Sequence, residues 1–201
     1  GVFPMLAKRE HGHNIVGLLA SVIHQTESLG NISYTPVVYT AEKIEEALKC
    51  LERETELMEI CRAELTSNPE SILLKKPDID ALAVTAGPGL EPALWVGISF
   101  VKFLSILWDL PVLPVNHMEG HITSVLLESK AQVGFPALGL LISGGHTELV
   151  AIETWGKYSV IGKTRDDAVG EAYDKAARIL NLPYPGGPAI SNHAHNVRNT
   201  Y

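Results

Sequence analysis

The chain has 201 residues, of which 46% are hydrophobic, and a formal net charge of −7. This length and composition allow either one sizeable core or two small lobes. The negative charge excludes a general nucleic-acid-binding surface. Any RNA contact therefore requires a local basic patch, a further segment or a partner.

The longest apolar stretches are interrupted by Lys102, by Asp109 or by prolines, and the first residues do not resemble a signal peptide. We therefore expect a soluble, cytoplasmic protein that enters no membrane. The sequence begins at Gly1 without an initiator Met and stops at Tyr201 within a regular pattern. These ends predict a piece of a longer protein.

Two amphipathic helices are expected in the first third of the chain. Pro4 suits the first position of a helix and Gly30 its end, and the apolar residues between them predict one stripe: Leu6, Ile15, Leu18, Leu19, Val22 and Ile23. Residues 32–39 predict a short extended segment. A second helix begins at Ala41 and carries Ile44, Leu48, Leu51, Met58, Cys61 and Leu65 at helical spacings. On this one helix Cys50 and Cys61 would lie about 16 Å apart, too far for a disulfide.

From Ile79 the pattern changes to that of an α/β protein. Residues 79–85 predict a buried strand, and residues 87–89 a tight turn. An apolar helix is expected over 92–108 and a second strand over 110–115. The order strand, helix, strand is typical of a parallel sheet with a crossover helix.

A pair of histidines follows the second strand. Asn116 can cap a helix, and His117 and His121 then lie one turn apart on the same face, where two imidazoles form half of a metal site. Glu119 is two positions after His117, so the glutamate is not where the His-Glu-x-x-His motif of zinc proteases requires it. The earlier residues His11, His13 and His24 fit solvated or capping roles better than ligation.

A hairpin is predicted after a linker over residues 130–136. Strands over 137–142 and 148–152 flank a turn that contains Ser143, Gly144, Gly145 and His146, and a third strand covers 158–161. Two glycines with φ > 0 would expose successive N–H groups as an anion-binding nest. An ordinary hairpin turn explains the same residues.

The next segment, residues 166–188, predicts a helix followed by a glycine turn. Asp166 or Asp167 can cap this helix, and Glu171 and Lys175 can form an i,i+4 ion pair. These are sufficient structural roles. Asp174 and Gly187 could instead flank a nucleotide.

Taken together, five motifs resemble the TsaD family of tRNA adenosine threonylcarbamoyltransferases, once described as O-sialoglycoprotein endopeptidases. The motifs occur in the order of that family: Ala86-Gly87-Pro88-Gly89-Leu90, Asn116-His117-Met118-Glu119-Gly120-His121, Ser143-Gly144-Gly145-His146-Thr147, Asp166 to Lys175, and Tyr184-Pro185-Gly186-Gly187-Pro188.

The resemblance implies an incomplete actin-like ATPase (ASKHA) fold of the α/β class. Lobe I would cover residues 1–135 without its first strands, with a helical insertion at about 31–77, and residues 136–201 would start lobe II. The implied reaction moves threonylcarbamoyl from its adenylate to N6 of the adenosine beside the anticodon, in tRNAs that read ANN codons. TsaB-like and TsaE-like subunits are the implied protein partners.

The same resemblance assigns the site residues. His117 and His121 would bind one divalent transition metal, Fe²⁺ or Zn²⁺. The adenine nucleotide, threonylcarbamoyl-AMP or ATP, would contact the segment Leu141, Ile142, Ser143, Gly144 and Gly145, together with Asp174 and Gly187. The family's third protein metal ligand, an Asp, falls outside this chain, so we expect the isolated chain to be inactive.

Three rival functions remain. A metallohydrolase of peptides is opposed by the position of Glu119. A sugar or acetate kinase of the same fold would hold Mg²⁺ with carboxylates rather than paired histidines. A non-catalytic paralogous scaffold subunit would not need a metal site.

Overall fold

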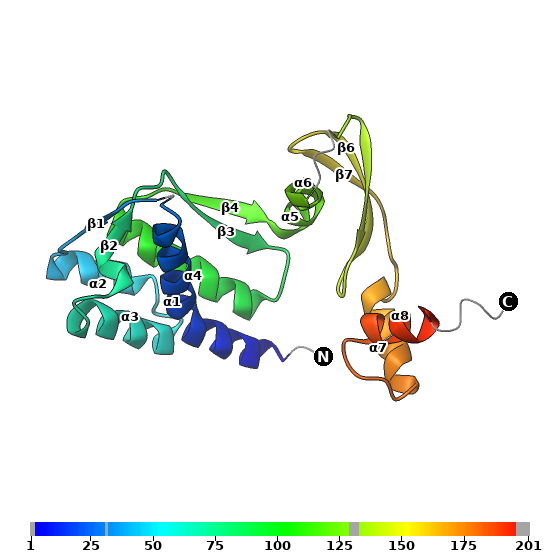
Figure 1. Ribbon diagram of the computed structural model, residues 1–201, viewed down its shortest axis with the longest axis horizontal. Helices are drawn as coiled ribbons and strands as arrows, with labels where there is room; N and C mark the ends of the chain where they lie inside the picture. The colour runs from blue at the N-terminus through cyan, green and yellow to red at the C-terminus, as the bar shows by residue number, and fades with distance from the viewer. Residues whose placement is uncertain (1–2, 31, 129–132, 196–201) are drawn as a thin grey trace. The chain divides into compact units, whose positions relative to one another are not determined.

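The structure, a computed structural model, describes residues 3–30, 32–128 and 133–195 (Figure 1). Its contacts divide it into two compact units, Gly1–Glu119 and Gly120–Tyr201, and each is described by itself. The linker expected over 130–136 falls partly on residues 129–132, which lie outside the described residues. The division into lobes at residues 135 and 136 therefore stays a prediction.

Helix α1 (Pro4–Ser28) opens the first unit, with Pro4 in its first turn as predicted. Gly30 follows its end with a φ of +67°, a left-handed value that glycine adopts readily. The expected apolar stripe is only partly right. Val16 and Ile23 are buried, whereas Leu18 and Val22 are exposed, because the face that meets the core is the one that carries Val16 and Ile23.

The helix predicted from Ala41 is wrong in its length, because the structure has two helices there, α2 (Ala41–Lys49) and α3 (Thr55–Ser67). Between them the N–H groups of residues 51, 52 and 54 donate to carbonyls three positions earlier, which tightens and ends the helix. The carboxylate of Glu54 is buried at this bend and lies 2.9 Å from Nζ of Lys8 in α1. Cys50 and Cys61 thus belong to different elements, and both are free thiols.

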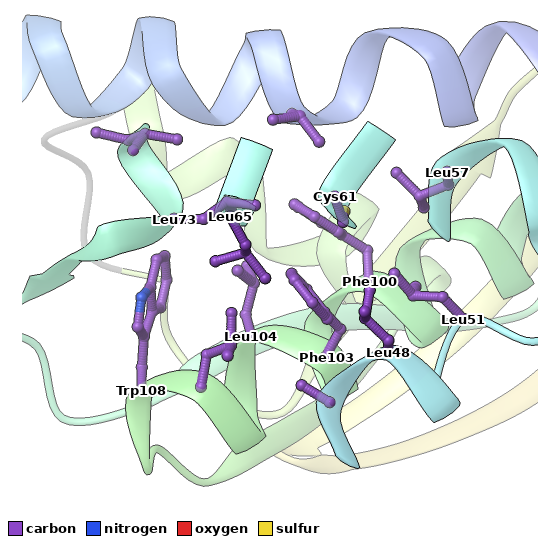
Figure 2. Packing of buried hydrophobic residues seen from close by; sticks show 14 of the residues in the cluster. Leu48, Leu51, Leu57, Cys61, Leu65, Leu73, Phe100, Phe103, Leu104 and Trp108 are labelled. Carbon is purple, nitrogen blue, oxygen red and sulfur yellow. The ribbon is translucent and has the colours of Figure 1, made fainter. Parts of the chain in front are cut away.

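The core of the first unit lies between α1, α2, α3 and helix α4 (Glu91–Trp108), as Figure 2 shows. A short 3-10 helix, η1 (Ile72–Leu74), closes it with the buried side chain of Leu73. The other central side chains are Leu48, Leu51, Leu57, Cys61, Leu65, Phe100, Phe103, Leu104 and Trp108. Within the described residues, α4 has the length and composition to cross a membrane. Its place in this core fits the main helix of a soluble protein equally well.

Two small sheets belong to the first unit. Strand β1 (Tyr34–Pro36) pairs antiparallel with β2 (Lys75–Pro77), which places a strand in the expected extended segment. Strand β3 (Leu82–Gly87) pairs parallel with β4 (Val112–Asn116), and α4 connects them, so the predicted α/β unit is confirmed. The first strand begins at Leu82 rather than Ile79 and is only partly buried. Leu113 of β4 is 54% exposed, because α4 packs against one face of this pair.

The second unit begins at Gly120, within helix α5 (His117–Thr123), and contains helix α6 (Val125–Glu128) and an antiparallel sheet. Strands β5 (Ala137–Ile142), β6 (Thr147–Thr154) and β7 (Lys157–Lys163) pair in chain order. The predicted hairpin and the predicted third strand are confirmed. Helices α7 (Val169–Ile179) and α8 (Gly186–His195) pack against each other after the sheet.

Candidate functional site

The predicted metal-binding histidines lie on helix α5 (His117–Thr123), which begins where β4 ends. The side-chain Oδ1 of Asn116 accepts hydrogen bonds from the N–H groups of Met118 at 2.9 Å and Glu119 at 3.4 Å, so the predicted cap is confirmed. This start of the helix fixes His117 and His121 one turn apart.

Two imidazoles at this spacing fit a transition metal as half of a ligand set. Within the described ranges 3–30, 32–128 and 133–195, no three His, Cys, Asp or Glu side chains are grouped as a metal site requires. A complete centre at His117 and His121 would need a further ligand from elsewhere. Metal binding at these positions stays a prediction.

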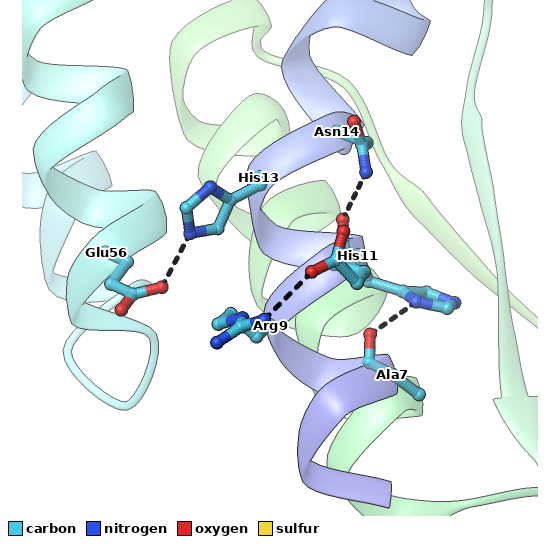
Figure 3. Close-up of polar contacts among 7 residues, drawn as sticks. Ala7, Arg9, His11, His13, Asn14 and Glu56 are labelled. Atoms are coloured by element: carbon cyan, nitrogen blue, oxygen red, sulfur yellow. Dashed lines mark hydrogen bonds and ion pairs between the residues drawn. The ribbon is translucent and has the colours of Figure 1, made fainter. Parts of the chain in front are cut away.

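The early histidines make local contacts, as Figure 3 shows. Nδ1 of His11 is 2.7 Å from the carbonyl of Ala7, and Nε2 of His13 is 2.9 Å from a carboxylate oxygen of Glu56 in α3. His13 and Glu56 are both largely exposed. These exposed contacts agree with the solvated role expected from the sequence, and neither His11 nor His13 caps a helix.

The turn between β5 and β6 is closed by the side chain of Ser143. The N–H of Ser143 donates to the carbonyl of His146 at 2.8 Å, and the N–H of His146 donates to Oγ of Ser143 at 3.0 Å. Neither Gly144 nor Gly145 has a φ in the left-handed region, so the expectation of φ > 0 here is wrong. Because the serine hydroxyl takes the bond that a main-chain carbonyl usually takes, the turn closes without those φ values.

The two glycines of this turn are exposed and have free space on the side where a Cβ would lie. A Cβ atom built on Gly144 or Gly145 would meet no atom within 4 Å. The two residues before the turn differ from each other: Leu141 is buried, whereas Ile142 is 57% exposed. The end of β5 is therefore anchored by Leu141, and the glycine backbone beyond it is accessible.

Helix α7 starts against this turn. Its N-cap residue is Ala168, and no side chain of the preceding segment caps it, so the predicted capping by Asp166 or Asp167 is wrong. Oδ1 of Asp167 instead lies 2.5 Å from Nζ of Lys175, which also lies 3.1 Å from Glu171 in the predicted i,i+4 pair. These two carboxylates raise the pKa of Lys175 above its ordinary value through hydrogen bonds to its amine.

The hydrogen bonds that α7 needs at its start come from the hairpin. The N–H of Val169 donates to Oγ1 of Thr147 at 2.9 Å, and the N–H of Gly170 donates to the carbonyl of Ser143 at 3.2 Å. A Cβ on Gly170 would lie 2.8 Å from Cα of Gly144, so only glycine fits between helix and turn. The residues at this junction that the sequence reasoning missed are Thr147 and Gly170.

Asp174, farther along α7, holds the start of α8. Its Oδ1 accepts a hydrogen bond of 2.7 Å from the N–H of Gly186, the first residue of α8. Gly187 follows directly and, with Tyr173, lines a cavity of about 350 Å³ whose other lining residues are Ile190, Ser191, Ala194 and His195. The predicted nucleotide residues thus lie at the end of β5, in the turn after it, in α7 and in α8. Helix α7 bonds to the turn through Gly170, and to the start of α8 through Asp174.

Comparison with known proteins identifies the family of this chain. Residues 64–201 match the family model described as TsaD, tRNA N6-adenosine threonylcarbamoyltransferase. The chain belongs to the TsaD family. The matched range contains every predicted metal and nucleotide residue, from His117 to Gly187.

Individual relatives named tRNA N6-adenosine threonylcarbamoyltransferase match parts of the chain. The relative from Endomicrobium trichonymphae is 56% identical over 118 residues, which are 59% of this chain and 34% of the relative. The relative from Pediococcus pentosaceus is 42% identical over 89% of this chain and 46% of its own length. The one from Streptococcus suis is 39% identical over 96% and 52%, respectively. The chain thus spans between a third and about half of the length of these TsaD relatives.

Proposed function

We propose that the protein represented by this chain transfers threonylcarbamoyl from threonylcarbamoyl-AMP to N6 of the adenosine 3′ to the anticodon in tRNAs that read ANN codons. The observation that supports the proposal most directly is the junction of the Ser143–His146 turn with α7, because α7 also carries Asp174, which bonds to the start of α8 beside Gly187. Membership of the TsaD family supports the same reaction.

In this proposal the second unit binds the adenylate. Gly144 and Gly145 are exposed and have no side chains, which allows phosphate oxygens to approach the backbone closely. Asp174 uses Oδ1 to hold α8, which leaves Oδ2 to accept a hydrogen bond from a ribose hydroxyl. Gly187, without a side chain, keeps the neighbouring cavity open to the ligand.

His117 and His121 would hold an Fe²⁺ or Zn²⁺ ion. When bound, such an ion polarises the carbonyl or phosphoryl oxygen at the reacting centre. The donor set is one protein ligand short within the described residues, so the proposal needs a carboxylate from the rest of the protein.

The wider organisation follows the family. We propose an actin-like fold with residues 1–135 in lobe I, an insertion at about 31–77, and residues 136–201 at the start of lobe II. The segment proposed as an insertion contributes Leu48, Leu51 and Cys61 to the core, so it is integrated into its unit. We further propose tRNA as substrate, TsaB-like and TsaE-like partner subunits, and a cytoplasmic location.

The test is transfer of labelled threonine from threonylcarbamoyl-AMP to a transcript of an ANN-decoding tRNA. We expect the 201-residue chain alone to be inactive, because loss of one supporting group at a metal site commonly costs about 10–100-fold. A chimera completes the chain with the segments of the Streptococcus suis relative that lie before and after the matched region. With the partner subunits present it should be active, and its His117→Ala variant should not.

Three results would count against the proposal or a part of it. A folded, metal-loaded chimera that transfers no threonylcarbamoyl would contradict the function. Robust turnover by the 201-residue chain alone would show that the ligand set is misjudged. Cleavage of a sialoglycoprotein by the same chimera would favour the peptidase alternative.

A further inference from the structure

Thr147 joins the hairpin to the segment that leads into α7 through two separate atoms. Its carbonyl accepts the N–H of Thr164 at 2.9 Å, and its hydroxyl accepts the N–H of Val169 at 2.9 Å. Ala168 occupies the N-cap position of α7, but its methyl side chain cannot accept a hydrogen bond. Thr147, 22 positions before Val169, therefore supplies the side-chain acceptor that Ala168 lacks.

The same junction brings backbone against backbone. Gly170 donates its N–H to the carbonyl of Ser143, and its Cα is so close to the turn that a Cβ would lie 2.8 Å from the Ser143 carbonyl oxygen. Asp174 is four residues beyond Gly170, about 6 Å along the helix. The spacing between the turn glycines and Asp174 is thus set by how α7 docks on the hairpin.

We propose that Thr147 is a positioning residue of the nucleotide site. It fixes the position of α7 so that the turn and Asp174 can contact one ligand at the same time. This inference rests on the proposed nucleotide-binding function. A ligand that contacts both the turn and Asp174 binds more tightly when their spacing is fixed. A ligand that contacts only one of them does not depend on this spacing.

This difference defines the experiment. Binding of adenosine, tripolyphosphate and ATP to the 201-residue chain is measured by NMR titration for the wild type, Thr147→Val and Thr147→Ser. Thr147→Val removes the hydroxyl and keeps the carbonyl bond to Thr164, and Thr147→Ser keeps both. Thr154→Val, at the exposed end of β6, is the matched control.

In Thr147→Val we expect the dissociation constant for ATP to rise about tenfold, the loss of roughly one hydrogen bond. Those for adenosine and tripolyphosphate should change by less than about twofold, because each touches one side of the junction. The amide of Val169 should also exchange faster with solvent. Thr147→Ser and Thr154→Val should behave as the wild type.

Other outcomes overturn the inference in distinguishable ways. If Thr147→Val weakens all three ligands equally, Thr147 has a merely structural role. If ATP binding is unchanged, the contact does not position the site. In both cases the proposed function stands. If the wild type binds none of the three ligands, the proposed nucleotide site fails, and the inference fails with it.

Discussion

The two neighbouring glycines at the start of α8 should respond in opposite ways to the same substitution. A Cβ on Gly186 would lie 2.6 Å from the Cβ of Ala177, 2.6 Å from the carbonyl oxygen of Tyr173 and 2.8 Å from Cα of Asp174. Two of these three atoms belong to the backbone of α7 and cannot rotate away. A Cβ on Gly187 would meet nothing within 4 Å.

The cost of Gly186→Ala can be worked from these contacts. Ordinary contact begins near 3.4 Å, so α8 must move by several tenths of an ångström to admit the methyl group. Such overpacking costs about 1–3 kcal/mol, and the movement also weakens the 2.7 Å hydrogen bond to Asp174. We expect a loss of about 3 kcal/mol, which lowers the melting temperature of a unit of this size by roughly 12–24 °C.

Gly187→Ala is the matched control. It should change the free energy of unfolding by less than about 1 kcal/mol, because alanine is the better helix former and has room. Its methyl group would enter the cavity that Gly187 lines, so ATP binding should weaken although the melting temperature is kept. Calorimetry and ATP titration of both variants are the assays. Equal melting temperatures for the two variants would refute the packing reasoning.

Three further outcomes are expected. Metal content measured by mass spectrometry should collapse in His117→Ala and in His121→Ala of the chimera, and stoichiometric metal in the double variant would contradict the site. Gly145→Val should weaken ATP binding with little change in melting temperature, because its side chain has space in the fold but blocks approach to the turn; a large loss of stability would oppose this. Burial raises the pKa of the Cys61 thiol to about 12, and it also raises the pKa of the less buried Cys50 thiol. At pH 8 Ellman's reagent should therefore modify Cys50 first. Equal rates of modification in the native chain would contradict the burial of Cys61.

The sequence predicted those parts of the fold that depend on neighbouring residues. The Asn116 cap, the apolar helix α4 between two strands and the hairpin around Ser143 all rest on local patterns, and the structure contains them. The break between α2 and α3 was not predictable in this way. Leu51 and Met58 are seven residues apart, a spacing that suits one continuous helix as well as two helices that share a core.

The candidate site shows the same limit more sharply. Its glycines and Asp174 could be named from motifs, whereas Thr147 could not, because its partner Val169 is 22 residues away and carries no polar side chain. Capping of α7 was assigned to Asp166 or Asp167, the nearest acidic residues, but Asp167 pairs with Lys175. Local reasoning cannot identify a cap that another element supplies.

The bond between Thr147 and Val169 also bears on how the sheet finds its alignment. Strand β5 is apolar on both faces: Leu138, Leu140 and Ile142 are exposed, while Leu141 is buried. Such a strand distinguishes poorly between its correct pairing and one displaced by a residue. Thr147 pairs with Ile142 and holds α7 on β6 through Val169, while the N–H of Gly170 donates to the carbonyl of Ser143, which directly follows β5. A displaced β5 would move that carbonyl and leave the N–H of Gly170 without its acceptor. The docking of α7 on the hairpin therefore favours the correct alignment of β5 with β6.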